Sequence, residues 1–215
     1  MHTNHRPLTR KTLASAAKHL AGIDADLGRI YKQYGPPPLW QRENGFATLL
    51  SIIIEQQVSL ASAKATVRRL KERLSPITAQ SFLTLSDEDL QSIGFSRQKI
   101  RYGRILAEAV RNGELNFAVL SRLDDREVIK TLTAIKGIGP WSAHIFMMEA
   151  LLRPDIWPAD DLALVKAVQK VKNLPEKPDG KKMQRLARPW RPLRAVAARM
   201  LWYAYIEGDE SVVPF

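Results

Sequence analysis

Two adjacent aspartates, Asp160 and Asp161, stand directly before an apolar run with helical spacing. A carboxylate in this position is commonly an N-cap or a first-turn acid that stabilises the start of a helix. The same group can also stabilise positive charge on a sugar ring while a glycosidic bond breaks, and can orient a water. The pair alone favours the capping role, so a chemical role depends on the motifs around it.

A glycine hairpin, Gly137-Ile138-Gly139, precedes the acid pair. Glycine tolerates positive φ and lets a ligand approach the backbone closely. Pro140 follows where we expect the first residue of the next helix. Exposed amide groups at such a helix start suit a phosphate, and Lys136 adds a positive charge. A tight turn between two helices, without any ligand, is the alternative interpretation.

The charge balance is compatible with a nucleic-acid partner. The 215 residues contain 33 Lys and Arg against 22 Asp and Glu, which gives a net charge of +11. Basic residues are dense from Lys166 to Arg199, where only Glu176 and Asp179 oppose them. A basic face that serves only solubility is the other interpretation.

The composition excludes several classes of site. The chain has no cysteine, which excludes disulfides, thiolate nucleophiles, zinc–thiolate sites and cysteine-ligated iron–sulfur clusters. No apolar run reaches the roughly 18 residues of a membrane span, and we see no secretory signal. We therefore expect no membrane partner and place the protein in the cytoplasm, although a transit peptide at the mildly basic N-terminus is a minor alternative.

Helical spacing recurs along almost the whole chain, and no stretch alternates with period two, which predicts an all-α fold of about ten helices. Capping residues mark several expected starts. We expect the last helix to begin at Pro192, the hairpin helix to run to about Leu152, and Asp160 or Asp161 to open a helix through Val171. The expected capping residues are Asp24, Ser59, Ser86 and Ser96, and the pair Asp124-Asp125 places negative charge at the start of the helix that leads into the hairpin.

Four segments together resemble the helix-hairpin-helix DNA glycosylase superfamily, and most of all its 3-methyladenine DNA glycosylase II branch. They cover roughly residues 40 to 207 in family order. The segments are LTAIKGIGPWSAHIFMM followed by PADDLAL, FATLLSIIIEQQVSLASAKA, LQSIGFSRQKIRYGRILAEAV and RPWRPLRAVAARMLWYAYIE.

This resemblance implies a two-lobed helical fold with the active-site cleft between the lobes. The central lobe would span residues 44–155 and contain the hairpin. The second lobe would combine residues 1–43 with residues 156–215. The segment Gly35-Pro36-Pro37-Pro38 breaks the helical pattern and would link the two lobes.

The resemblance also implies roles for the motifs already described. Asp161 would be the catalytic carboxylate, and Asp160 would be the helix cap. Amides around Gly137 and Gly139 would bind phosphates beside the lesion. The other implied DNA-binding residues are Gln56, Gln57 and Ile138, with Gln57 as the wedge that fills the gap left by a flipped nucleotide. Lys136 stands where relatives commonly carry a proline, and we expect its charge to add a phosphate contact. A polar residue at a helix end is the alternative interpretation of Gln57.

Aromatic residues would form the base pocket by the same resemblance. Trp141, Trp202 and Tyr203 match base-binding positions, and Trp40 and Trp157 are weaker candidates. A cationic alkylated base on an aromatic ring gains cation–π attraction, although each ring could equally be a core residue. Ile145 stands where some relatives carry a tyrosine, so the base preference can differ.

The resemblance further implies that no cofactor is required. Carbonyls of Thr133, Ile135 and Ile138 would hold a structural monovalent cation. Bifunctional relatives carry a lysine nucleophile two residues after the second hairpin glycine. Trp141 occupies that position here, which predicts a monofunctional hydrolase without lyase activity.

The expected function is hydrolysis of the N-glycosidic bond of alkylated purines, chiefly 3-methyladenine and 7-methylguanine, in damaged double-stranded DNA. Two alternatives stay open: a non-catalytic DNA-binding protein that recognises lesions, and a glycosylase for neutral lesions such as hypoxanthine or ethenoadenine. We expect a monomer that acts in base excision repair, near the nucleoid in a bacterium or in the nucleus of a eukaryote.

Overall fold

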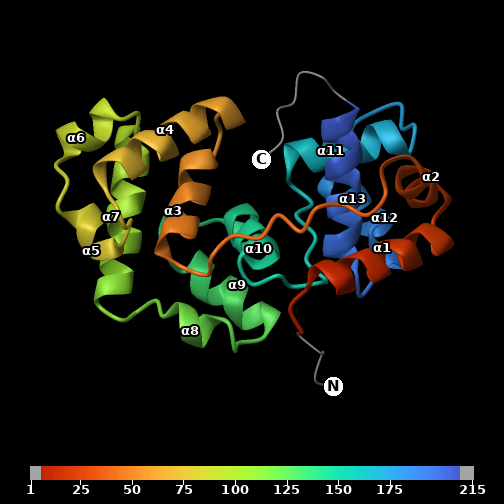
Figure 1. Ribbon diagram of the computed structural model, residues 1–215, viewed down its shortest axis with the longest axis horizontal. Coiled ribbons are helices and arrows are strands. Elements are labelled where there is room, and N and C mark those ends of the chain that lie inside the picture. Colours follow the sequence, from red (N-terminus) through yellow and green to blue (C-terminus); the bar gives the residue numbers. More distant parts are fainter. Residues whose placement is uncertain (1–5, 209–215) are drawn as a thin grey trace. The chain divides into compact units, whose positions relative to one another are not determined.

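The structure is a computed structural model that describes residues 6–208 (Figure 1). Every regular element in this range is helical, with thirteen α-helices, one 3-10 helix and no strand. The all-α prediction is confirmed, and three short helices account for the larger count. Within the described range, no helix has both the length and the apolar character needed to cross a bilayer.

The chain divides into two compact units. The central unit comprises Arg42–Phe146, and the terminal unit combines the residues up to Gln41 with those from Met147 onward. The predicted division placed 147–155 in the central part, but these residues group with the chain ends. Backbone hydrogen bonds explain this, since Leu8 N–H donates to Leu152 O (2.8 Å) and Ala195 N–H donates to Pro154 O (3.0 Å).

The core of the central unit is α3 (Phe46–Glu55). Seven of its side chains are buried because nearly every position is apolar. It packs against α7 (Arg97–Arg111) and α4 (Leu60–Arg73), as Figure 1 shows. The remaining helices of the unit are α5 (Ala79–Leu83), α6 (Asp87–Ser92), α8 (Phe117–Leu120), α9 (Asp125–Thr133) and the first part of α10 (Pro140–Glu149).

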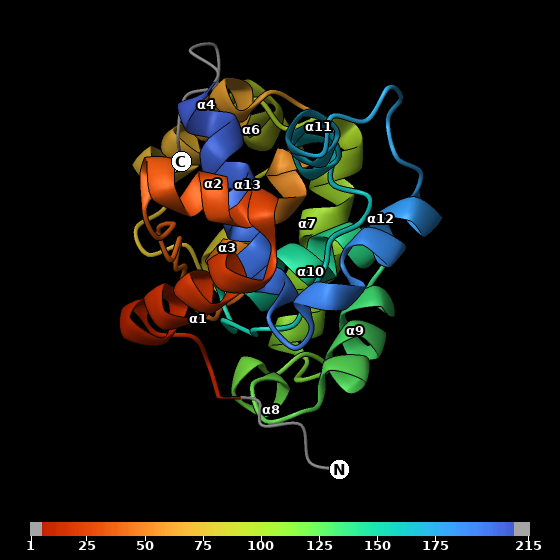
Figure 2. The ribbon, with the colours of Figure 1, turned by 90° about the vertical axis from the view of Figure 1, so that its right-hand side faces the viewer.

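The core of the terminal unit is α13 (Arg194–Glu207), whose residues 195–202 are all buried. It packs against α1 (Arg10–Ile23), α2 (Ala25–Tyr34) and α11 (Leu162–Val171), and Figure 2 shows α1 and α2 in front of it. A basic segment, α12 (Gly180–Leu186) followed by the 3-10 helix η1 (Arg188–Trp190), completes the unit.

Arg199 connects three segments of the terminal unit from a fully buried position. Its guanidinium donates to Met148 O (2.6 Å), Leu39 O (3.1 Å) and Ala195 O (3.3 Å). Burial lowers the pKa of Arg199 to about 10, which leaves the side chain charged at neutral pH. A buried cation of this kind is tolerated because its donors are satisfied.

Four predicted caps are confirmed, since Asp24, Ser59, Ser86 and Ser96 each accept a backbone N–H of the following helix. Asp124, expected only as a negative charge at a helix start, is the N-cap of α9. Two predicted helix limits are wrong by two or three residues. Helix α10 ends at Glu149 rather than near Leu152, and α13 begins at Arg194 rather than Pro192.

Candidate functional site

The glycine hairpin joins α9 to α10 in the central unit. Helix α9 ends at Thr133, and Ile138 N–H donates to Ile135 O (3.0 Å) to close the turn. The Ile138 side chain is buried, whereas Gly139 and Pro140 are exposed. Among the described residues, the N–H groups of Gly137 and Gly139 form no hydrogen bond. The hairpin therefore presents two unsatisfied donors at the start of a helix, which suits a phosphate.

The two glycines are required for different reasons. Gly137 has φ +101°, and a Cβ there would lie 2.3 Å from Cγ of Tyr102. A Cβ on Gly139 would meet nothing within 4 Å. The first glycine therefore allows the hairpin to pack on Tyr102, and the second leaves space beside the backbone for a ligand.

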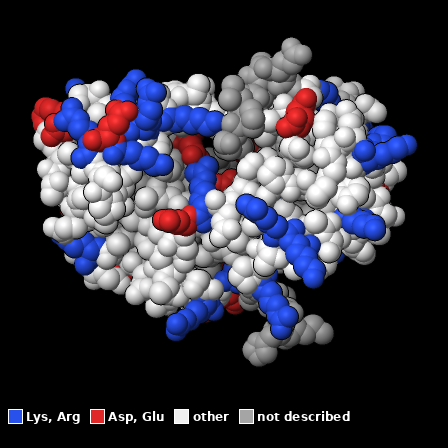
Figure 3. Space-filling view, viewed as in Figure 1, with Lys and Arg blue, Asp and Glu red and all other residues white. Residues whose placement is uncertain are grey.

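Cationic side chains accompany the hairpin. The guanidinium of Arg101 lies 5.5 Å from the ring centroid of Tyr102. A hydrogen bond from Gln98 lowers the pKa of Tyr102, and the charges of Arg101 and Lys136 act in the same direction. Figure 3 shows that Lys and Arg side chains gather in several patches on the face in view.

Gln56 supports the hairpin from inside the protein. Its Nε2 donates to Gly137 O (2.9 Å) and to Ser142 Oγ (2.8 Å). The sequence predicted Gln56 as a DNA-binding residue, but its amide nitrogen is committed to the protein. We assign it a positioning role, because it connects the end of α3 to the hairpin and to the first turn of α10.

Gln57 is the exposed residue of a rigid turn. It has φ +55°, a region that costs a residue with a side chain of order 1–3 kcal/mol. The three residues before it are each fixed by a side chain. Lys99 Nζ donates to Ile54 O (2.6 Å), Arg42 pairs with Glu55 (2.8 Å), and Gln56 bonds the hairpin. The turn therefore presents the Gln57 side chain outward from a fixed base, as a wedge requires.

The carbonyls predicted to hold a cation retain acceptor capacity. In the described chain, the carbonyls of Thr133 and Ile138 accept no backbone hydrogen bond, and that of Ile135 accepts one, from Ile138 N–H. A carbonyl oxygen has two lone pairs, and such oxygens suit hard cations. The residues present thus fit a monovalent ion. No group of three His, Cys, Asp or Glu side chains within residues 6–208 resembles a metal site.

Asp161 is held by two donors in the terminal unit. Its Oδ1 accepts Leu164 N–H (2.7 Å) in the first turn of α11 and the indole N–H of Trp202 (3.0 Å) on α13. Its side chain is half-buried. Two donors on one oxygen, from two helices, fix the orientation of the carboxylate.

The division of roles within the acid pair was wrong. Asp161 is itself the N-cap of α11, and Asp160 is exposed. A turn in which Asp161 N–H donates to Pro158 O (3.0 Å) brings Asp161, rather than its neighbour, to the helix start. The capping role and the predicted catalytic role therefore fall on one carboxylate, which the cap holds in place.

Three predicted pocket aromatics cluster in the terminal unit, and one of them, Trp202, contacts Asp161. The ring centroid of Trp40 lies 6.4 Å from those of Trp202 and Tyr203, with edge-on geometry to both. Trp40 has φ +45°, a strained conformation of the kind that occurs at binding sites. Trp202 is 7% exposed, so little of its ring is open to a flipped base. Its main role is to support Asp161 and Trp40. Trp40 and Tyr203 are the more accessible rings.

Trp157 and Trp141 are the remaining aromatic candidates. Trp157 is 2% exposed and packs edge-on against Trp190 (5.4 Å), so it is a core residue and its candidacy was wrong. Trp141 lies in the first turn of α10, in the central unit, and is half-buried. Ile145 is buried on the same helix.

Sequence reasoning missed residues that act through long-range contacts. Tyr102, Ser142 and Lys99 support the hairpin and the Gln57 turn, and Arg199 fixes the residue before Trp40. Only Ser142 gave a signal, since it directly follows the Gly-Pro-Trp of the hairpin. The others lie far along the chain from the residues they hold.

Comparison with known proteins agrees with this geometry. Residues 50–192 match the model of the HhH-GPD superfamily base excision DNA repair protein family. The chain is 29% identical to DNA-3-methyladenine glycosylase 1 of Schizosaccharomyces pombe, over 89% of this chain and 87% of that protein. It is 27% identical to the alkylbase DNA glycosidase-like protein mag2 of the same organism, over 87% and 91%.

Solved structures give the same result. The S. pombe 3-methyladenine DNA glycosylase Mag1 in complex with abasic DNA superposes with a TM-score of 0.85 and 28% identity, covering 93% of this chain and all of that one. A DNA-3-methyladenine glycosidase from Bacillus halodurans gives 0.77 and 33%, with 92% of each chain covered. Because the family model matches two thirds of its length, the chain belongs to the HhH-GPD superfamily of base excision DNA repair proteins.

Proposed function

We propose that this protein is a monofunctional DNA glycosylase that removes alkylated purines, chiefly 3-methyladenine and 7-methylguanine, from double-stranded DNA. The observation that carries the proposal is the carboxylate of Asp161, held by Leu164 N–H and Trp202 Nε1–H beside Trp40 and Tyr203. The relatives named for 3-methyladenine support the substrate class.

DNA binding would begin at the hairpin. The free N–H groups of Gly137 and Gly139 bind a phosphate, and Lys136 contributes charge. A monovalent cation on the carbonyls of Thr133, Ile135 and Ile138 would supply further positive charge beside that phosphate. Gln57 enters the stack, which stabilises the extruded state of the target nucleotide.

The flipped base would then meet aromatic rings. A purine alkylated at N3 or N7 carries a positive charge, and an electron-rich ring attracts it by about 0.5–2 kcal/mol. Trp40 and Tyr203 offer the accessible rings of the terminal unit. A neutral purine lacks this attraction, so the same pocket favours charged lesions.

The chemical step requires little from the protein. The C1′–N bond breaks, and its electron pair leaves with the alkylated base, which becomes neutral without receiving a proton. Asp161 stabilises the oxocarbenium-like sugar by its negative charge. Water adds to C1′ and releases a proton to solvent, which yields an abasic site and a free base. Trp141 has no amine at the lyase position, so no Schiff base forms there.

The test is mass analysis of bases released from methylated duplex DNA by wild type, Asp161→Asn and Asp160→Asn. Asparagine caps helices as well as aspartate, so Asp161→Asn should keep its melting temperature while release falls by at least 100-fold, the scale set by losing one electrostatic group. Asp160→Asn should release bases like wild type. No release by wild type would favour a non-catalytic DNA-binding protein, and release of hypoxanthine instead would favour neutral lesions.

A further inference from the structure

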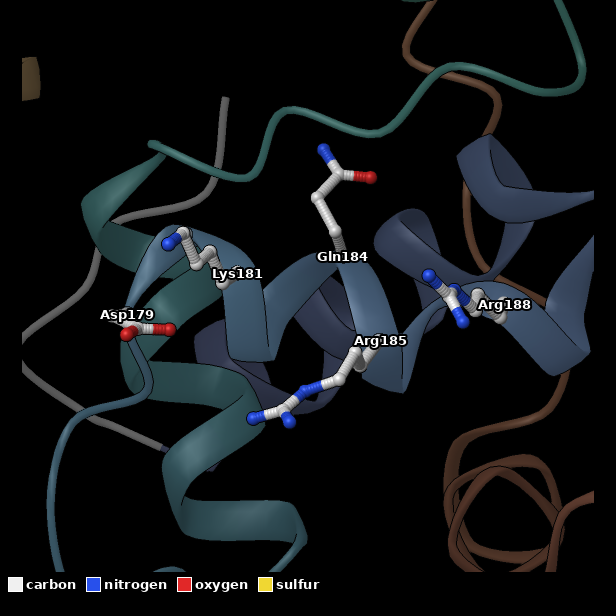
Figure 4. A pocket seen from close by; sticks show the side chains of 6 residues that line it. Asp179, Lys181, Gln184, Arg185 and Arg188 are labelled. Atoms are coloured by element: carbon white, nitrogen blue, oxygen red, sulfur yellow. The ribbon is translucent and has the colours of Figure 1, made fainter.

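We propose that the basic segment formed by α12 and η1 carries a second phosphate-binding surface, which holds the DNA backbone within the unit that carries Asp161. This surface consists of Lys181, Gln184, Arg185 and Arg188. The inference that it binds the DNA backbone rests on the proposed function. These residues, with Asp179 and Gly180, line an open hollow of about 530 Å³. Figure 4 shows their side chains spread along the helix rather than gathered around one point.

The charge of the hollow is unbalanced. Three cations face one carboxylate, and that carboxylate is engaged as the N-cap of α12, with Asp179 Oδ1 accepting Lys182 N–H (2.6 Å). Two half-buried cations of the terminal unit do have acidic partners, Lys172 with Asp24 (2.8 Å) and Arg194 with Asp155 (2.8 Å). Lys181, Arg185 and Arg188 are exposed and form no ion pair with any residue from 6 to 208.

The segment that carries these cations, α12 with η1, is firmly attached. Met183 is fully buried on its inner side. Trp190, in the next element, is 1% exposed and donates its indole N–H to Asp24 (3.0 Å). The polar side chains therefore project from a fixed helix, which reduces the entropy lost when they bind a ligand.

The position of α12 relates it to the candidate catalytic residue. A Cβ on Gly180 would lie 3.7 Å from Oδ1 of Asp160, the neighbour of Asp161. The hairpin, by contrast, belongs to the central unit. A phosphate contact within the terminal unit would fix the strand relative to Asp161 directly, without depending on the hairpin.

Phosphodiester is the ligand that this chemistry favours. Guanidinium groups match phosphate oxygens with paired donors, and the Gln184 amide adds a neutral donor. The hollow is open and its polar side chains are spaced along the helix, which suits a polymer backbone passing over the surface. A compact small molecule would instead require convergent groups in an enclosed pocket.

Salt dependence of DNA affinity tests this surface. Each phosphate contact contributes about 0.9 to the slope of log K against log salt. The combined variant Lys181→Gln, Arg185→Gln and Arg188→Gln should lower that slope by about 2 to 3. A matched control removes three exposed cations from α1 and α2 of the same unit, Lys11→Gln, Lys18→Gln and Lys32→Gln, and should leave the slope within about 0.5 of wild type.

An unchanged slope in the α12 variant, with an unchanged melting temperature, would overturn the proposal. An equal loss in the control would also overturn it, because the effect would then reflect net charge. Ethylation interference gives an independent result, since the α12 variant should lose sensitivity at one contiguous set of phosphates and keep that of the hairpin. Failure of the proposed function would appear separately, as no base release by wild type despite a normal salt slope.

Discussion

The indole N–H of Trp202 donates to Oδ1 of Asp161 at 3.0 Å, the same oxygen that caps α11. Trp202 is thus a positioning residue for the carboxylate as well as a neighbour of the aromatic pair. A hydrogen bond to a charged group contributes about 1.5–3 kcal/mol. Losing it should misorient Asp161 while leaving its charge.

Trp202→Phe therefore should slow single-turnover base release by about 10- to 100-fold. The ring remains, so the Kd for undamaged duplex DNA should change little. Tyr203→Phe is the matched control, since it removes a polar group from the same helix without touching Asp161. Equal rates for Trp202→Phe and wild type would show that the indole N–H does not position the carboxylate.

Replacing Gln57 by glycine should reduce nucleotide flipping while it increases the stability of the protein. Its φ of +55° suits glycine, so Gln57→Gly should raise the free energy of unfolding by about 1 kcal/mol. Gln57→Ala keeps the strain and should not. Both variants remove the wedge, and both should reduce nucleotide flipping, measured by the fluorescence of 2-aminopurine opposite the lesion. Normal flipping in both would exclude Gln57 as the wedge.

Substitutions of the two hairpin glycines should have different effects, one on folding and the other on DNA binding. Gly137→Ala would place a Cβ 2.3 Å from Tyr102 in a backbone conformation with φ +101°, and should destabilise the protein by more than about 2 kcal/mol. Gly139→Ala meets no atom within 4 Å, so it should melt like wild type. Its methyl group should nevertheless obstruct the phosphate and weaken DNA affinity about tenfold, the effect of losing one charged hydrogen bond. Wild-type affinity for Gly139→Ala would argue against a phosphate on this amide.

Local signals explain which features could be predicted from the sequence. A cap such as Ser59, Ser86 or Asp124 bonds an amide three residues ahead, so its role is readable from neighbouring residues. Helices α5, α8 and α12 were missed because a helix of four to seven residues is too short to show a periodic apolar face.

The candidate site was harder to predict than the helix caps, because its residues are held by partners far along the chain. Asp160 and Asp161 are equally good caps by type, and the choice between them involves the Pro158 turn and a tryptophan 41 residues away. Gln56 contacts the hairpin across 81 residues. Residue types were sufficient to locate the hairpin and the acid pair in the sequence. The partners that hold them appear only in the folded chain.

A half-buried charge cluster should govern the pH dependence of stability. Asp24 caps α2 and accepts hydrogen bonds from Lys172 Nζ (2.8 Å) and Trp190 Nε1 (3.0 Å). Burial alone would raise the pKa of Asp24, but the hydrogen bonds from Lys172, Leu27 N–H and Trp190 outweigh it and lower the pKa below its ordinary 3.8. Burial would likewise lower the pKa of Lys172, but its bonds to Asp24 and Asp26 raise it above 10.5.

The signs of these shifts define a pH window. A lowered carboxyl pKa gives stability that is complete above pH 3.8 and is lost as pH falls through the folded value. A raised lysine pKa gives stability that is complete below pH 10.5 and is lost as pH rises through the folded value. The cluster should therefore contribute fully between these limits and fade outside them.

Asp24→Asn keeps the cap but removes the charge beside Lys172. It should lower the free energy of unfolding by about 1.5–3 kcal/mol near neutral pH, the usual contribution of a hydrogen bond to a charged group. Urea unfolding from pH 3 to pH 10 should show that this difference is constant near neutrality and shrinks in acid. Asp124→Asn, at a cap that forms no ion pair among residues 6–208, should lose well under 1 kcal/mol. A deficit for Asp24→Asn that persists undiminished below the ordinary carboxyl pKa would mean that lost packing, rather than lost charge, destabilises the variant.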